Sequence, residues 1–160
     1  MLQTGDRAPE FRLPDETGME ISLSTLLSRG PLILYFYPAD FTPVCTKEAC
    51  MVRNTYDELQ AAGITIAGVS PNDEETHRRF KKKHSLEHTL LADVKKHVIR
   101  LFGVNGPLGI SVRRATFLID PSRQILNALC ADFRLSRHSD FLRKTIITPS
   151  TENISNREQL

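Results

Sequence analysis

The fold is decided by residues 32–45, which read Leu32-Ile33-Leu34-Tyr35-Phe36-Tyr37-Pro38-Ala39-Asp40-Phe41-Thr42-Pro43-Val44-Cys45. The first six of these residues form a continuous apolar run of β-forming types, which predicts a strand that is buried on both faces. Pro38 ends this strand. Thr42 is placed to act as an N-cap, and Pro43 suits the first position of a helix. The stretch therefore predicts a buried strand, a short turn and a helix that covers the sheet.

On both sides of this stretch the sequence predicts further strands and helices. The helix after Thr42 is expected to end at Gly63, and a hairpin-like turn is expected over 14–18. The other predicted strands are residues 64–70, 90–91, 115–120 and 125–129, and the other predicted helices are 22–27, 71–84, 94–102 and 138–147. This order predicts an α/β fold in which a central mixed β-sheet is flanked by helices on both faces.

Length and composition limit the class of protein. A chain of 160 residues with 40% apolar residues argues for one domain, expected over 1–148, and the polar residues 149–160 are expected to form a loose tail. No apolar run approaches ~18 residues, so no membrane span is expected. The first residues lack the pattern of a secretory signal, so the expected location is cytoplasmic. The net charge of +2 gives no reason to invoke nucleic acid.

The cysteines of the chain are Cys45, Cys50 and Cys130. Three cysteines at uneven spacing do not suggest a disulfide framework, which leaves redox catalysis, a metal site or buried bystanders. Cys45 falls in the first turn of the helix after the buried strand, where unpaired backbone N–H groups and the helix dipole stabilise a negative charge. In such folds the turn at the carboxyl end of a central strand is where function usually resides. This position favours a reactive cysteine over a structural one.

Three motifs in sequence order resemble those of peroxiredoxins. Pro38-x-x-x-Thr42-x-x-Cys45 resembles the PxxxTxxC active-site motif of that family. Residues 5–13, Gly-Asp-Arg-Ala-Pro-Glu-Phe-Arg-Leu, resemble the family's N-terminal G-x-x-A-P-x-F-x-L, and residues 114–120, Arg-Ala-Thr-Phe-Leu-Ile-Asp, resemble its R-x-x-F-x-I-D strand. The second cysteine, five positions after the first, is similar to that of the bacterioferritin-comigratory or Q-type subgroup. The resemblance covers about residues 3–147 and implies a thioredoxin-like fold.

The resemblance implies a thiol-dependent peroxidase that reduces hydrogen peroxide and alkyl hydroperoxides. Cys45 would attack the peroxide and become a sulfenic acid, and Cys50 would condense with it to form an intramolecular disulfide. Thioredoxin or a similar dithiol protein would then reduce that disulfide. The reaction needs no cofactor and no metal, and the expected assembly is a monomer or a weak homodimer.

Fixed hydrogen-bond donors around the peroxide must supply most of the acceleration. Ionisation of a thiol contributes only ~10–30-fold at neutral pH, whereas enzymes accelerate reactions by ~10⁶ or more. The donors available are the Thr42 hydroxyl, the backbone N–H groups around Val44 and Cys45, and a guanidinium. The family match assigns the guanidinium to Arg114. Strand alternation points Arg114 and its neighbour Arg113 to opposite faces, so only one of the two can face Cys45.

Other residues of this region have expected supporting roles. Pro38 is expected to shield the nascent sulfenate from over-oxidation. Glu48 is expected either to orient the guanidinium or to pair with the helix dipole. Asp40 and Phe41 are expected at the mouth of the site, in contact with substrate or reductant, although Phe41 fits a packed loop aromatic equally well. The basic residues 78–83 are expected to form a solvated helix face.

The two nearby cysteines cannot form a disulfide within a straight helix. Five residues correspond to ~7.5 Å of rise and ~500° of rotation, which exceeds the ~7 Å limit between the Cα atoms of a disulfide. The first turns of this helix must therefore unwind in each cycle. Val44 departs from the glycine that is common here in Q-type sequences and is also seen in one-cysteine peroxiredoxins, so an external resolving thiol is an alternative. Cys130 is expected to be a bystander, with a role as a second resolving thiol as the minor alternative.

Two other classes of function compete with a peroxidase. A thiol–disulfide oxidoreductase is disfavoured because its C-x-x-C pair is absent. A non-enzymatic redox sensor would oxidise Cys45 without rapid turnover. Measurement of peroxide consumption separates these alternatives.

Overall fold

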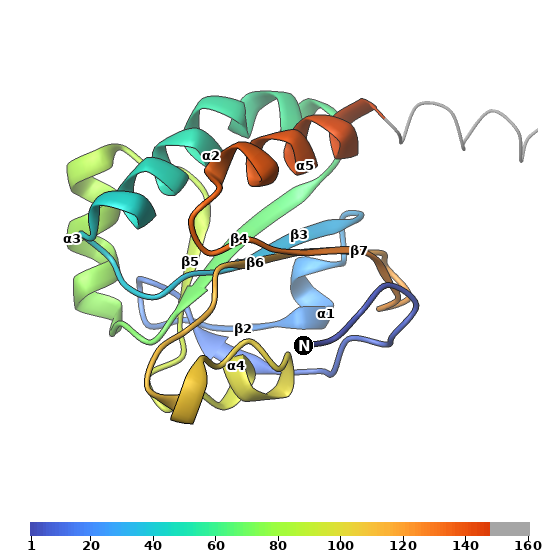
Figure 1. Cartoon of the computed structure of the whole chain (residues 1–160). Coiled ribbons are helices and arrows are strands. Elements are labelled where there is room, and N and C mark those ends of the chain that lie inside the picture. The colour runs from blue at the N-terminus through green and yellow to red at the C-terminus, as the bar shows by residue number, and fades with distance from the viewer. Residues whose placement is uncertain (148–160) are drawn as a thin grey trace, which may run out of the picture.

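A five-stranded mixed sheet forms the centre of the computed structural model, which describes residues 1–147 (Figure 1). The strand order is β5-β4-β3-β6-β7. β4 (Thr65–Ser70) pairs in parallel with β3 (Leu32–Phe36) and β5 (Thr89–Ala92), whereas β6 (Ala115–Ile119) pairs antiparallel with β3 and β7 (Ile125–Cys130). The predicted α/β architecture with a central mixed sheet is confirmed. The predicted tail, 149–160, lies outside the described residues.

The middle strand β3 is buried on both faces, as its apolar run predicts. Successive side chains of a strand point to opposite faces of the sheet. Leu34 and Phe36 therefore belong to one core cluster, whereas Tyr35 and Tyr37 belong to the other. The turn that follows β3 therefore lies at the carboxyl end of the central strand, beyond the core on either face of the sheet.

The helices divide between the two faces of the sheet. α2 (Pro43–Ala61), α3 (Glu74–His84) and α5 (Leu135–Ile147) cover one face, and their apolar side chains join the cluster of Tyr35. α1 (Leu23–Leu26), α4 (His97–Leu101) and the hairpin of β1 (Arg12–Pro14) and β2 (Glu20–Ser22) cover the other face. Figure 1 shows α2 and α5 above the sheet and α1 and α4 below it. Among the described residues, no helix is both long and apolar enough to cross a membrane.

Helix boundaries differ from the sequence expectation where backbone angles and single side chains set them. α4 begins three residues later than predicted, since Lys96 adopts a left-handed conformation with φ 54° and the Asp93 carboxylate caps the following turn. α5 begins at Leu135, three residues earlier than predicted. A short 3₁₀ turn over Pro107–Gly109 has no counterpart in the sequence analysis. It matters because it borders the pocket described next.

Candidate active site

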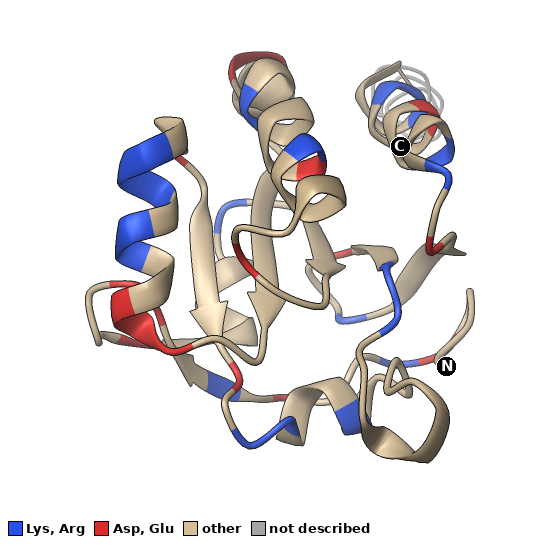
Figure 2. Cartoon of the chain, turned by 60° about the vertical axis from the view of Figure 1, so that its left-hand side comes forward, with Lys and Arg blue, Asp and Glu red and all other residues tan. Residues whose placement is uncertain are grey.

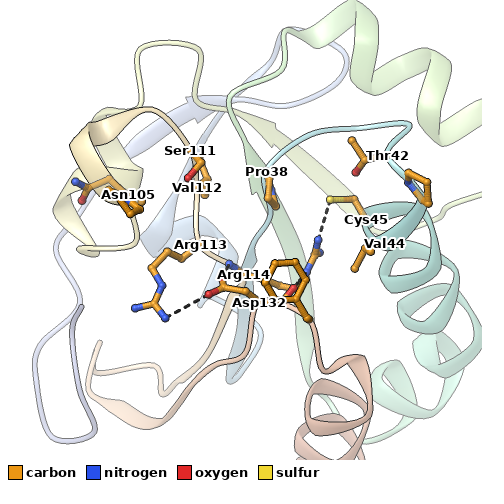
Figure 3. A pocket seen from close by; sticks show the side chains of 14 residues that line it. Pro38, Thr42, Val44, Cys45, Asn105, Ser111, Val112, Arg113, Arg114 and Asp132 are labelled. Atoms are coloured by element: carbon orange, nitrogen blue, oxygen red, sulfur yellow. Dashed lines mark hydrogen bonds and ion pairs between the residues drawn. The ribbon is translucent and has the colours of Figure 1, made fainter.

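The strand-turn-helix unit of β3 and α2 brings Cys45 to the wall of a pocket. Cys45 lies in the first turn of α2 and is only 2% exposed. The pocket has a volume of about 880 Å³ and opens between the start of α2 and the segments around residues 105–114 and 132–133 (Figure 3). Its lining is Pro38, Thr42, Pro43, Val44, Cys45, Asn105, Gly106, Pro107, Ser111, Val112, Arg113, Arg114, Asp132 and Phe133.

Arg114, the residue just before β6, extends its side chain to the sulfur of Cys45. Its Nη2 donates to Cys45 Sγ at 3.0 Å, and its Nη1 forms a buried ion pair with Glu48 of α2. Asp132 orients the arginine: its carboxylate accepts from the Arg114 backbone N–H at 2.9 Å, and its carbonyl oxygen accepts from Nε at 3.3 Å. Arg113, by contrast, turns outward and pairs with Asp132 Oδ2 at 3.3 Å, with half of its side chain exposed (Figure 3). The two arginines, which lie just before β6, thus point in different directions, and only Arg114 reaches the sulfur.

Burial and charge act together on the Arg114–Glu48 pair. Burial raises the pKa of Glu48 to about 7, against the opposing effect of Arg114. Burial works to lower the pKa of Arg114, but Glu48 and Cys45 outweigh it, so this pKa is raised. The guanidinium therefore keeps its positive charge while buried against the sulfur. A fixed cation at hydrogen-bond distance stabilises a thiolate and any negative charge that develops beside it.

Thr42 takes the N-cap position of α2 but does not cap the helix with its side chain. Its hydroxyl donates to the carbonyl oxygen of Ala39 at 3.0 Å. The expectation that this hydroxyl donates to a peroxide is therefore revised: with its proton engaged, the oxygen is available as an acceptor. The unpaired N–H groups of the first helical turn, around Val44 and Cys45, remain the donors at this end of the pocket.

Pro38 and Val44 line the pocket together with Cys45. The pocket also contains residues that sequence reasoning missed, notably Asp132 and Phe133 just beyond β7. Phe133 is 90% exposed, which is unusual for a phenylalanine. No spacing pattern in the sequence links this segment to Cys45, because their proximity depends on the pairing of β6 with β7.

The three cysteines are free and lie in different environments. Cys45 and Cys50 both lie on α2, which is continuous from Pro43 to Ala61, and Cys50 is half-buried. Cys130 ends β7 and packs against the core cluster on the opposite face of the sheet. Burial raises the pKa of the Cys130 thiol. The sheet thus separates Cys130 from the pocket sulfur.

Asp40 and Phe41 do not both lie at the mouth of the site, and for Asp40 the expectation is wrong. Asp40 is 6% exposed and points inward, where its carboxylate accepts from the Tyr37 hydroxyl and contacts His77 of α3. Phe41 is partly exposed, and its ring packs edge-on against Phe80 of α3 at 5.2 Å between centroids. The spacing of residues 77 and 80 is the sequence signal for this contact, because it places both on the buried face of α3. The Lys and Arg residues of α3 lie on its outer side, as Figure 2 shows.

Comparison with known proteins shows to which protein family the chain is similar. Residues 4–128 match the AhpC/TSA family. Peroxiredoxin Bcp of Escherichia coli is 38% identical over 145 residues, which cover 87% of this chain and 92% of that protein. The chloroplastic peroxiredoxin Q of Oryza sativa subsp. japonica is 38% identical over 138 residues, which cover 86% of this chain and 63% of that protein.

Solved structures agree with these relatives. The crystal structure of peroxidoxin BcpB from Mycobacterium tuberculosis superposes with a TM-score of 0.85 at 38% identity and covers 91% of this chain and 97% of that chain. The bacterioferritin comigratory protein of Xanthomonas campestris superposes with a TM-score of 0.78 at 26% identity, with 85% and 89% of the two chains covered. With a cysteine beside a buried arginine at the start of α2 and with these relatives, the chain belongs to the AhpC/TSA family and is a peroxiredoxin, a thiol-dependent peroxidase with a thioredoxin-like fold.

Proposed function

We propose that Cys45 is the nucleophile that reduces hydrogen peroxide and alkyl hydroperoxides. The observation that carries this proposal is the 3.0 Å hydrogen bond from Arg114 Nη2 to Cys45 Sγ at the wall of the pocket. It pairs the sulfur with a buried, permanently charged donor, which neither Cys50 nor Cys130 has among the described contacts. The Cys45 thiolate is therefore the species that Arg114 holds ready for attack.

The first step transfers one oxygen from the peroxide to sulfur. The Cys45 thiolate attacks one oxygen of R–O–O–H, so that an S–O bond forms and the O–O bond breaks. Sulfur loses the two electrons that the peroxide gains, the products are the sulfenic acid and R–O⁻, and the alkoxide then takes up a proton. Arg114 and the first-turn N–H groups stabilise the charge that shifts onto the oxygens. The peroxide's own O–H can donate to Thr42 Oγ1, whose proton is engaged by Ala39.

The second step, in this proposal, is resolution by Cys50. Its thiol attacks the sulfenic sulfur of Cys45, which forms a disulfide and releases water. Because both cysteines lie on the continuous helix α2, five residues apart, the first turns must unwind before the sulfur atoms can meet. Cys130 is a poorer candidate, since it packs on the far side of the sheet.

The third step is reduction of the disulfide by a dithiol protein such as thioredoxin, through thiol–disulfide exchange. Such reductants maintain reduced thiols in the cytoplasm, which is where we place the cycle. The substrate range rests on the pocket, which at about 880 Å³ is far larger than hydrogen peroxide requires and has the apolar side chains of Val44, Val112 and Phe133 in its wall. Alkyl peroxide reduction is the activity for which the Xanthomonas campestris relative was solved with ligand.

The test is NADPH oxidation coupled through thioredoxin reductase and thioredoxin, with peroxide as the limiting substrate. Cys45→Ser is expected to lose turnover completely, and Cys50→Ser is expected to stop after one oxidation with a sulfenic acid on Cys45. Cys130→Ser is the matched control and is expected to turn over like the parent protein. Undiminished turnover of Cys45→Ser would overturn the proposal, and full turnover of Cys50→Ser would replace Cys50 by an external resolving thiol.

A further inference from the structure

The loop that leads into α2 is bound to α3 by a buried pair, Asp40 and His77. The Asp40 carboxylate accepts from the Tyr37 hydroxyl at 2.6 Å through Oδ1, and its Oδ2 lies 2.6 Å from His77 Nδ1. His77 Nε2 lies 3.2 Å from the carbonyl oxygen of Leu91 at the end of β5. The side chains of Asp40 and His77 are both completely inaccessible to solvent. The pair therefore joins the loop, α3 and β5 in one contact.

The positions of the protons follow from the acceptors. The carbonyl oxygen of Leu91 can only accept, so His77 Nε2 carries a proton. One further proton lies between His77 Nδ1 and Asp40 Oδ2, because these atoms meet at hydrogen-bond distance. Loss of either partner leaves the other buried without its hydrogen bond, which makes this contact costly to open.

The backbone of the loop is held at the same point. The Asp40 N–H donates to Asn72 Oδ1 at 2.9 Å, and the Ser70 hydroxyl donates to the same oxygen at 2.8 Å. Asn72 lies in the connection between β4 and α3. The side chains that hold Asp40 are therefore those of Tyr37 just after β3, Asn72 before α3 and His77 of α3, and none of its described contacts involves α2. Figure 1 shows the loop passing beside α3 before it enters α2.

The residue after Asp40 marks a change in backbone direction. Phe41 has φ 64°, a left-handed conformation that a bulky side chain rarely adopts. The ring of Phe41 packs on Phe80, and Lys83 Nζ lies 5.8 Å from the centroid of the Phe41 ring. The side chain of Phe41 is therefore also held to α3. The next residue, Thr42, is the N-cap of α2, which begins at Pro43. The boundary between the segment attached to α3 and the helix that carries the cysteines therefore falls between Phe41 and Thr42.

We propose that the Asp40–His77 contact is the latch that limits the unwinding of α2 at its N-terminal side and sets how often the site opens. The proposal rests on the proposed function, in which α2 must unwind for Cys50 to reach Cys45. Residues 38–41 stay bound to α3 and β5 while the turns from Thr42 onward leave. Asp40 and His77 act here as positioning residues, because neither touches the sulfur or the peroxide.

The latch matters because the sulfenic acid of Cys45 has two fates. In the open site, the Cys50 thiol condenses with it to give the disulfide and water. In the closed site, a second R–O–O–H transfers an oxygen to it, which gives the sulfinic acid and R–OH, and sulfur loses two more electrons to that peroxide. The ratio of sulfinic acid to disulfide therefore measures how long the site stays closed. Without the latch, residues 38–41 can leave together with α2, which adds conformational freedom to the open site only and so favours opening. A weaker latch therefore lowers this ratio and also slows the first oxidation, which needs the closed site.

Two substitutions of His77 remove its contacts with Asp40 and with Leu91 one at a time. The amide nitrogen of asparagine reaches the place of Nδ1, and that of glutamine reaches the place of Nε2. His77→Gln therefore keeps a donor for the Leu91 carbonyl but loses the contact with Asp40, whereas His77→Asn keeps the donor to Asp40. His138→Gln is the matched control, because buried His138 likewise contacts Thr116 through Nδ1 and the Ala131 carbonyl through Nε2, away from the loop.

The measurement is intact-mass analysis of the full chain after a fixed excess of hydrogen peroxide, together with the rate of Cys45 oxidation. His77→Gln is expected to lower the ratio of sulfinic acid to disulfide about tenfold and to slow Cys45 oxidation, while His77→Asn stays within about threefold of the parent. His138→Gln is expected to keep the ratio of the parent even if its melting temperature falls. A role in stability alone would lower the melting temperatures of both Gln variants and leave both ratios unchanged.

Several outcomes overturn the latch. Equal ratios in His77→Gln and the parent refute it, and so do equal losses in His77→Gln and His77→Asn. If His77→Gln does not fold, the isosteric Asp40→Asn replaces it, and a ratio equal to that of the parent again refutes the latch. In the disulfide form of the parent, the Asp40 amide is expected to stay protected from hydrogen exchange while amides after Thr42 lose protection. A parent chain that forms no Cys45–Cys50 disulfide would instead contradict the proposed function.

Discussion

Arg114→Gln removes the charged donor from the sulfur of Cys45 and tests the central contact of the site. The guanidinium donates to Sγ at 3.0 Å and is held by Glu48 and by Asp132, so no other described side chain replaces it at the sulfur. Glutamine keeps a polar group of shorter reach without the charge. Glu48 is then left without its cation, and burial keeps its carboxyl protonated, so that the variant need not bury an unpaired charge.

The size of the effect follows from the geometry. Two unit charges 3.0 Å apart interact by about 5.5 kcal/mol at an effective dielectric constant of ~20, and this is an upper value because the guanidinium charge is delocalised. Removal of one fixed donor from a charge-stabilising site costs roughly 10²–10³ in rate, or about 2.7–4 kcal/mol. We therefore expect Arg114→Gln to slow the oxidation of Cys45 by hydrogen peroxide by about 10²–10³-fold.

The assay is a rapid quench of the reduced protein with peroxide, followed by thiol alkylation and intact-mass analysis. The chain contains no tryptophan, so mass replaces the usual fluorescence signal. Arg113→Gln is the matched control, because this neighbouring arginine is half exposed and points away from the sulfur, and its rate is expected to stay within about twofold of the parent. A folded Arg114→Gln variant that reacts within about threefold of the parent would refute the reasoning.

Three further predictions concern single side chains. Thr42→Val is expected to slow Cys45 oxidation about tenfold or more, because it removes the acceptor and frees the Ala39 carbonyl, whereas Thr42→Ser retains the rate; equal rates in the two variants would contradict this role. The pKa of Glu48 is raised from its usual 4.5 to about 7, so the folded state binds a proton that the unfolded state releases, and this stability is full below pH 4.5 and is lost as the pH rises through about 7. One pKa unit corresponds to about 1.36 kcal/mol, so the unfolding free energy of the parent minus that of Glu48→Gln should fall by about 3 kcal/mol over this pH range. Urea titrations at several pH values measure this difference, and a difference that does not change with pH would contradict the raised pKa. Gly68→Ala is expected to lower the unfolding free energy by about 1–3 kcal/mol, because its Cβ would lie 2.6 Å from the Tyr35 ring; an unchanged melting temperature would show that the ring moves freely.

Much of the site could be predicted because its main features depend on residues that are close together in the sequence. The apolar run 32–37 and the residues from Thr42 onward determine the strand, the turn and the helix by local propensity and capping preference. The position of Cys45 in the first helical turn follows from them. Alternation along a strand indicated that only one of Arg113 and Arg114 can face Cys45, and the resemblance to the family motif indicated Arg114; the structure has Arg114 against the sulfur and Arg113 turned outward.

What could not be predicted depends on residues far apart in the chain. The Asp40–His77 pair joins residues 37 positions apart, and nothing in either local sequence indicates the other. The same holds for Asp132, which orients Arg114 only because β6 pairs with β7. The hydrogen bond that the Thr42 hydroxyl donates also depends on the fold, because the Ala39 carbonyl oxygen comes within reach of it only once the loop has its final shape.

The sequence by itself determined the α/β architecture, the helix that follows Thr42 and the place of Cys45 in its first turn, and the five-residue spacing of Cys45 and Cys50 is the basis on which we propose that α2 unwinds. Each of these follows from helix and strand geometry over a few residues, where backbone sterics leave few alternatives. Only the tertiary structure decided which charges are buried together and which side of the loop is held. Burial and pairing are properties of the packed core, and they arise when segments distant in the sequence exclude water from the space between them.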